Sequence, residues 1–75
     1  MTEIAPGITV DPKVRFGKPI IGGTRVPVDT VVARVATGME IKRVAKEYAI
    51  TENDVYNALH YAALRLAEEE VWVTA

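Results

Sequence analysis

The sequence predicts a mainly α fold, a three-helix helix-turn-helix (homeodomain-like) core with a short N-terminal β arm or hairpin. Three observations predict it: apolar residues recur at helical spacing between residues 28 and 66, a helix-start signature stands at Thr51, and the preceding segment holds short β-type runs broken by Pro and Gly. We therefore divide the single domain into a β arm (1–27), a helical core (28–70) and a C-terminal tail or short strand (71–75).

Length and composition limit how this domain is stabilised. At 75 residues without Cys, the chain has a small core and neither disulfides nor a thiolate metal site to reinforce it. An apolar content of 49% with a net charge of −1 favours self-association, so we expect a homodimer. The sequence shows neither an apolar run of about 18 residues nor a signal-peptide pattern, which predicts a cytoplasmic protein with no membrane partner.

The β arm is predicted from short extended segments. Residues 8–10 are a β-type run followed by Asp-Pro, and residues 19–28 are extended segments with a turn at Gly22 and Gly23. The prolines of the second stretch lack the N–H that a central strand needs, so they suit an edge position. We expect an exposed ribbon, or an arm that pairs with a second copy and contributes to dimerisation.

The first helix is predicted to begin at Val28 and to continue for about ten residues. Its apolar face repeats at helical spacing, in Val28, Val31, Val32, Val35 and Ala36. Gly38 is placed to end the helix in a left-handed conformation. Because Val is a poor helix former, packing of this stripe rather than intrinsic propensity must hold the helix.

The second and third helices differ in how clearly their starts are marked. The second, from Ile41 to Tyr48, has an apolar face and a basic face but no good N-cap residue. The third begins after Thr51, which can cap the amide of Asp54 in a variant of the capping box. Its apolar face extends to Leu66, and the glutamates that follow oppose the helix dipole, so this end is expected to fray.

The spacing of these two helices is typical of a helix-turn-helix unit, although a plain three-helix packing unit gives the same pattern. Ala49 occupies the turn position where Gly is common, so it must either avoid the left-handed region or accept some strain.

If the unit binds DNA, its third helix would present base-reading residues from its N-terminal turns. These are Thr51, Asn53, Tyr56, Asn57 and His60. Phosphate contacts would come from cations on the second helix and the arm, namely Lys42, Arg43, Lys46, Lys13, Arg15 and Lys18. Glu52 and Asp54 oppose this reading, because acids near phosphates weaken binding.

Charge is distributed unevenly along the chain. Residues 1–46 carry eight Lys/Arg against four acids, a net +4, whereas residues 47–75 carry one Arg against six acids, a net −5. The chain could pair head to tail with a second copy or offer its basic half to nucleic acid, and ordinary surface scatter remains a third explanation.

Three further residues are candidates for partner binding or for a structural role: Lys18, Arg25 and Trp72. The Arg25 guanidinium could bond a carboxylate such as that of Asp54, or the carbonyl end of a helix. Alternatively, it could clamp a phosphate or enter the acidic site of a nuclease partner. Trp72 could lie in a dimer core or form part of a partner-binding tail.

The residue inventory argues against catalysis. His60 is the single His, and neither Cys nor Ser occurs, so one chain cannot assemble a Ser-His-Asp or Cys-His arrangement. The acidic residues do not cluster with His60 at metal-ligand spacing. We predict a protein that is not an enzyme and that has neither a cofactor nor a metal site.

Two motifs in the chain point to a family. The motif Gly-Lys-Pro-Ile-Ile-Gly-Gly-Thr-Arg-Val-Pro-Val at residues 17–28 and the motif Thr-Glu-Asn-Asp-Val-Tyr-Asn-Ala-Leu-His-Tyr-Ala-Ala at residues 51–63 resemble the bacterial domain of unknown function 433 family. The resemblance implies an antitoxin-like regulator of a type II toxin-antitoxin system that binds a PIN-like nuclease toxin and, as a dimer, operator DNA. The alternative is a protein-interaction adaptor that does not bind DNA.

Overall fold

The computed structural model describes residues 1–73. Three strands, a single 3-10 turn and three α-helices follow one another in the chain. They are β1 (Thr2–Ala5), β2 (Ile8–Val10), η1 (Arg15–Gly17), β3 (Ile20–Ile21), α1 (Val28–Ala36), α2 (Ile41–Tyr48) and α3 (Glu52–Glu68). The three helices and the N-terminal β segment are as predicted, but the β segment is a three-stranded antiparallel sheet of order β1-β2-β3.

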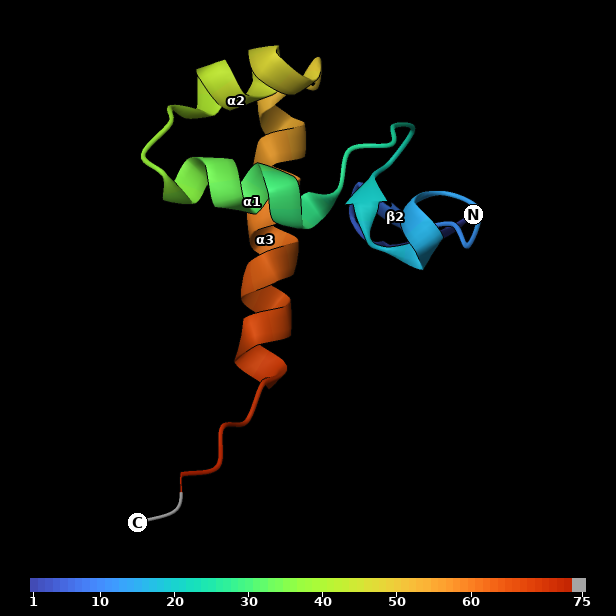
Figure 1. The fold of residues 1–75 in the computed structure, drawn as a ribbon, viewed down its shortest axis with the longest axis vertical. Helices are drawn as coiled ribbons and strands as arrows, with labels where there is room; N and C mark the ends of the chain where they lie inside the picture. The colour runs from blue at the N-terminus through green and yellow to red at the C-terminus, as the bar shows by residue number, and fades with distance from the viewer. Residues whose placement is uncertain (74–75) are drawn as a thin grey trace.

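The longest helix organises the molecule. Figure 1 shows α3 along the long axis, with α1 crossing it, α2 at its N-terminal end, and the sheet to one side next to the start of α1. Both α1 and α2 pack on α3, and β2 also contacts it. The sheet is thus attached to the helices through α3 as well as through the chain connection to α1.

One hydrophobic core joins the sheet to the helices. Its buried members are Ile8, Ile21, Val28, Val31, Val44, Ala45, Val55 and Ala58. Ile20 and Ile21 of β3 are 2% and 0% exposed, because β3 pairs with β2 of the same chain. The expectation of an exposed ribbon is therefore wrong, and the contact of this segment with a second copy stays a prediction.

The Gly- and Pro-rich motif after Lys18 folds back on itself between β3 and α1. The Thr24 hydroxyl donates to the Ile21 carbonyl (2.8 Å) and accepts from the Val26 N–H (3.0 Å). Gly22 approaches the β1–β2 turn so closely that a Cβ there would lie 3.3 Å from the carbonyl oxygen of Gly7. The Gly and Thr residues of the motif therefore form the turn that leads the chain from the sheet into α1.

The ends of α1 and α2 follow the chemistry read from the sequence. Gly38, beyond the last turn of α1, has φ +92° and donates to the Val35 carbonyl, as predicted. The α2 N-terminus lacks a side-chain cap at Glu40. Ala49 takes the left-handed conformation (φ 54°, ψ 42°), so the turn before α3 accepts strain.

The start of α3 is a full capping box. The Thr51 hydroxyl accepts from the Asp54 N–H, and the Asp54 carboxylate accepts from the Thr51 N–H, both at 3.0 Å. The helix ends at Glu68, and residues 69–73 have no regular secondary structure. Residues 71–73 therefore form a tail rather than a strand. Residues 74 and 75 of the predicted C-terminal segment lie outside the described residues.

Candidate nucleic-acid interface

The basic face of α2 lies on the outside of the molecule. Lys42, Arg43 and Lys46 are all exposed, whereas Val44 and Ala45 on the opposite face are buried against α1 and α3. The three cations line a shallow hollow of about 570 Å³ together with Glu40 and Glu47. The predicted phosphate-binding residues of α2 are thus grouped on one accessible face, which the two acids partly neutralise.

The N-terminal turns of α3 present several of the predicted base-reading residues. Asn53 and His60 are exposed, and Tyr56 is 57% exposed. Thr51 is also exposed, but its hydroxyl already accepts the Asp54 N–H and serves as the helix cap. Thr51 is therefore explained by helix formation, and the three other side chains remain available to a ligand.

The fifth predicted base-reading residue, Asn57, does not share this exposed surface. It is half-buried, and a Cβ added at Gly7 would lie 2.5 Å from its Nδ2 atom. The β1–β2 turn therefore lies directly against Asn57, and Gly7 (φ +73°) is the residue that permits the close approach. Asn57 is therefore less accessible than the other base-reading candidates, and its contact with DNA bases stays a prediction. The helical period alone could not reveal which face of α3 the sheet covers.

A second basic region surrounds η1, and it has an unusual backbone. Arg15 and Phe16 both have positive φ, 51° and 56°, and the Gly17 N–H closes the turn on the Val14 carbonyl (3.1 Å). Two central residues with positive φ define a turn that normally contains Asn or Gly. With bulky side chains, each such residue costs on the order of 1–3 kcal/mol.

The strained turn holds the Phe16 ring entirely in solvent. Its relative exposure is 102%, and no residue of η1 is buried. Sequence alone predicted phosphate contacts for Lys13, Arg15 and Lys18 but none for Phe16, because a single Phe in an apolar-rich chain is expected in the core. The Gly that follows it was the available turn signal, and it does not specify the conformation of the two residues before it.

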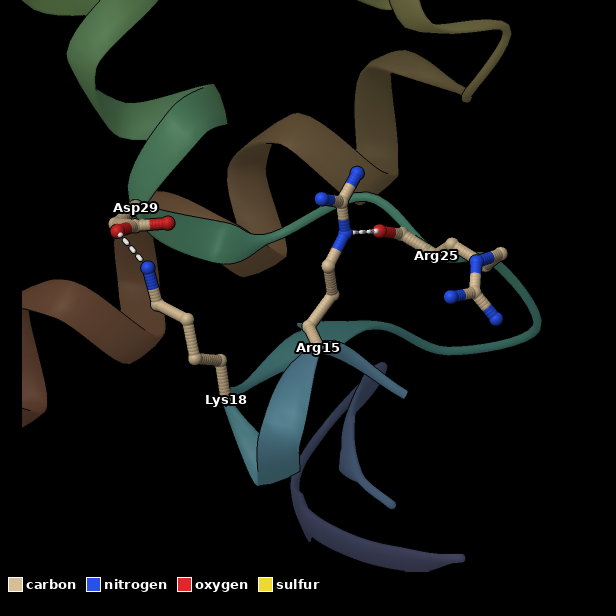
Figure 2. A network of polar contacts seen from close by, with 4 residues as sticks. All are labelled: Arg15, Lys18, Arg25 and Asp29. Atoms are coloured by element: carbon tan, nitrogen blue, oxygen red, sulfur yellow. Dashed lines mark hydrogen bonds and ion pairs between the residues drawn. The ribbon is translucent and has the colours of Figure 1, made fainter. Parts of the chain in front are cut away.

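Polar contacts fix this region to the rest of the fold (Figure 2). The Lys18 ammonium donates to the Asp29 carboxylate at 2.7 Å, and the Arg15 Nε donates to the Arg25 carbonyl at 3.2 Å. The hydrogen bond and charge of Lys18 lower the pKa of Asp29, against a smaller opposing effect of desolvation. Lys18 therefore makes a structural contact with α1, and its binding to a partner stays a prediction.

The expected bond from Arg25 to Asp54 does not form. Figure 2 shows the Arg25 guanidinium directed away from the other labelled side chains, and within residues 1–73 it makes no side-chain hydrogen bond or ion pair. The Asp54 carboxylate instead accepts the Thr51 N–H. Arg25 thus contributes its carbonyl to the fold and leaves its charge in solvent.

An apolar hollow lies between α1 and the C-terminal half of α3. It has a volume of about 440 Å³, and its apolar lining residues include Val28, Val32, Ala33, Tyr61, Ala62 and Leu66. The nearby tail exposes further apolar surface, with Trp72 87% exposed. Lys18 also lines the hollow, so this apolar surface borders the basic region around η1.

The described part of the chain offers neither a metal cluster nor a membrane-spanning helix. Within residues 1–73, the acidic and His side chains form no group of three or more that could hold a metal ion. None of the helices in that range combines the length and the hydropathy needed to cross a bilayer.

A family model described as protein of unknown function (DUF433) matches residues 8–62. The chain belongs to this family. The matched region includes β2, η1, β3, α1, α2 and most of α3, so both basic regions and the turn before α1 lie inside the DUF433 domain. None of the curated proteins is significantly similar to the chain.

Two solved structures resemble this DUF433 chain. A DUF433 member from Anabaena variabilis is 32% identical with a TM-score of 0.73, over 83% of this chain and 62% of that one. Rv2018 from Mycobacterium tuberculosis is 29% identical with a TM-score of 0.65, over 69% of this chain and 24% of that one. The chain therefore spans less than two thirds of the first protein and about a quarter of the second.

Proposed function

We propose that the chain is an antitoxin-like regulator that binds DNA as a homodimer through α2 and α3. The observation that carries the proposal is the exposed group of Lys42, Arg43 and Lys46 on α2, connected by a short turn to the polar N-terminal turns of α3. In helix-turn-helix proteins the first helix crosses the phosphate backbone and the N-terminal residues of the second contact base edges. In this chain α2 carries the cations that suit phosphate contacts, and the N-terminal turns of α3 carry the polar side chains that suit base contacts.

The packing of the two helices supports this geometry. Val44 and Ala45 of α2 and Val55 and Ala58 of α3 are buried in the same core, which fixes the crossing of the helices. The turn between them consists of residues 49–51 only, with Ala49 in the left-handed conformation. A rigid, short connection of this kind holds base-reading side chains in a constant position relative to the cations on α2.

Electrostatics favours a dimer over a single copy. Glu52 in the first turn of α3 and the acids flanking the α2 cations oppose phosphate binding. A second copy would double the number of cations on one DNA molecule and would match two half-sites about one helical turn apart. We therefore expect weak binding by a monomer and salt-sensitive binding by a dimer.

The test compares two substitutions that change the charge equally. Arg43→Glu reverses a charge on α2, whereas Arg65→Glu makes the same reversal near the C-terminal end of α3. Binding is measured by fluorescence anisotropy with duplex DNA from upstream of the chain's own gene, at low and moderate salt. The proposal expects Arg43→Glu to weaken binding at least about tenfold at low salt and to reduce its salt dependence, with little effect of Arg65→Glu. Equal effects of both variants would mean non-specific attraction.

The alternative proposal is a protein-interaction adaptor that does not bind DNA. It is favoured by the apolar hollow between α1 and α3 and by the exposed tail around Trp72. The proposed protein partner, a PIN-like nuclease toxin, follows from the family resemblance. Co-expression with a PIN-like nuclease encoded beside the chain's gene tests it. A complex that Trp72→Ala weakens, formed by a chain that binds no DNA, would favour the adaptor.

A further inference from the structure

We propose that the loop of residues 13–18 is a second nucleic-acid contact, in which the Phe16 ring stacks on a nucleobase while Lys13 and Arg15 hold the flanking phosphates. The inference rests on the proposed DNA-binding function and names a residue and a mode of binding that α2 and α3 do not supply. The loop would recognise the flat face of a nucleobase that is flanked by phosphates. Such a face is found in an opened duplex step and in an unpaired strand.

The exposure of Phe16 has no explanation in the packing of this chain. The ring is 102% exposed, and the turn that carries it buries none of its residues. Other exposed apolar groups, such as Leu66, line a hollow next to further apolar side chains. Phe16 instead stands between Arg15 and Gly17, in a loop that also carries Lys13 and Lys18.

The backbone of the turn does not require Phe either. Arg15 and Phe16 both occupy the left-handed region, which Asn and Gly adopt with much less strain. An Asn-Gly pair would give the same turn and a more stable chain. A strained conformation that lifts an aromatic ring into solvent is typical of a binding site, where the surrounding structure maintains the strain.

The charge around the ring favours nucleic acid over protein. Lys13, Arg15 and Arg25 are exposed, and the Arg15 to Arg25 carbonyl bond joins the two loops that carry them. The nearby acids are engaged, since Asp11 accepts the Lys13 N–H and Asp29 pairs with Lys18. A protein hot spot surrounds its aromatic anchor with a closely packed rim, whereas a nucleic acid offers a stacking face flanked by phosphates.

The decisive variant is Phe16→Gly, because it removes the ring and relieves the strain at the same position. If Phe16 acts by stacking, this variant keeps the fold, unfolds at a temperature roughly 4–8 °C higher, and binds nucleic acid about tenfold more weakly. A merely structural Phe16 would not combine higher stability with weaker binding. Val71→Gly is the matched control, because it removes an exposed apolar side chain that lies in the C-terminal tail, outside both basic regions, and should leave binding unchanged.

A conservative replacement completes the experiment. Phe16→Trp in a Trp72→Phe background keeps a stacking ring and makes it the single Trp of the chain. It should bind as the wild type does, with quenching of Trp fluorescence on binding. Each protein is titrated with the upstream duplex and with a single strand of the same sequence. If Phe16→Gly loses affinity for the duplex alone, Phe16 stacks at an opened base step. If it loses affinity for the single strand alone, Phe16 stacks on an unpaired base.

The outcomes separate this inference from the function on which it rests. Unchanged binding by Phe16→Gly would overturn the stacking contact and leave DNA binding by α2 and α3 intact. Weakened binding by both Phe16→Gly and Phe16→Trp would also overturn it, because an aromatic ring would then not suffice. No binding of either nucleic acid by the wild type would overturn both proposals.

Discussion

The two basic regions of the molecule carry charge in different ways. On α2, Lys42, Arg43 and Lys46 occupy the outer face of an unstrained helix whose other face is buried. Around η1, cations are grouped by a strained turn that also exposes Phe16. Charge on the outside of an amphipathic helix is ordinary, since any solvated helix needs a polar face. A strained aromatic residue among cations needs a further reason and is therefore the more specific indication of binding.

Both regions nevertheless depend on one core, and the largest effect we expect comes from disrupting it. Ile21 of β3 is fully buried in the core that joins the sheet to the helices. Ile21→Ala should lower the free energy of unfolding by about 2–4 kcal/mol, because the cavity cannot close in so small a domain. Urea unfolding followed by circular dichroism measures this, with Ile4→Ala, at a 42% exposed site, as the mild control.

The Ile21→Ala variant also tests whether the sheet and the helices unfold as one cooperative unit. Ile8 and Ile21 from the sheet share the core with residues from all three helices. We therefore expect a single unfolding transition that is shifted as a whole. A variant that lost the order of the sheet while its helices unfolded at the wild-type midpoint would show that the regions fold independently.

The next largest effect is on DNA affinity. Lys13→Glu in the η1 region and Lys46→Glu on α2 make the same charge change at exposed sites. Each is expected to weaken binding of the upstream duplex by about 3–10-fold at low salt, and the effects should multiply in the double variant. Fluorescence anisotropy at two salt concentrations measures both. An effect of Lys46→Glu alone would restrict the interface to α2 and α3.

Backbone strain is present beside α2 as well as in η1. Ala49 at the end of α2 and Phe16 in η1 both have positive φ. Replacement of either by Gly should stabilise the chain by about 1 kcal/mol, measured as a higher midpoint of thermal unfolding. A lower midpoint for either Gly variant would contradict the strain assigned to that position.

The sequence predicted the parts of the fold that local chemistry decides. Thr51 and Asp54 form a capping box because both members lie within one turn, and Gly38 ends α1 because the left-handed region favours Gly. The apolar stripe of α1 likewise identified Val28 and Val31 as core residues. Each of these features depends on residues at most a few positions apart.

The sequence could not predict features that depend on contacts between distant segments. Asn57 was proposed to read bases because it lies in the N-terminal turns of α3, and the sequence could not show that the turn at Gly7 packs against it. A bond from Arg25 to Asp54 was one of the alternatives, but the Asp54 carboxylate accepts the Thr51 N–H instead. Phe16 was missed because Arg-Phe carries no turn signal, and its positive φ is imposed by contacts on either side of the loop.

The smallest effect we expect concerns the ion pair that joins the η1 region to α1. Lys18 lowers the pKa of Asp29 below its usual value of 3.8, so the pair stabilises the fold above that value and the contribution is lost as the pH falls through the lowered pKa. Both side chains are more than half exposed, at 55% and 63%, so screening limits the contribution to less than about 0.5 kcal/mol.

The pair can be separated from the effect of Asp29 on the helix dipole. Lys18→Met removes the pair and keeps the carboxylate in the first turn of α1, whereas Asp29→Asn removes both. Thermal unfolding near neutral pH should rank the wild type as most stable, then Lys18→Met, then Asp29→Asn. All three should converge in acid, where Asp29 is protonated. A Lys18→Met deficit that persisted in acid would mean that the Lys18 ammonium stabilises the fold through a group other than the Asp29 carboxylate.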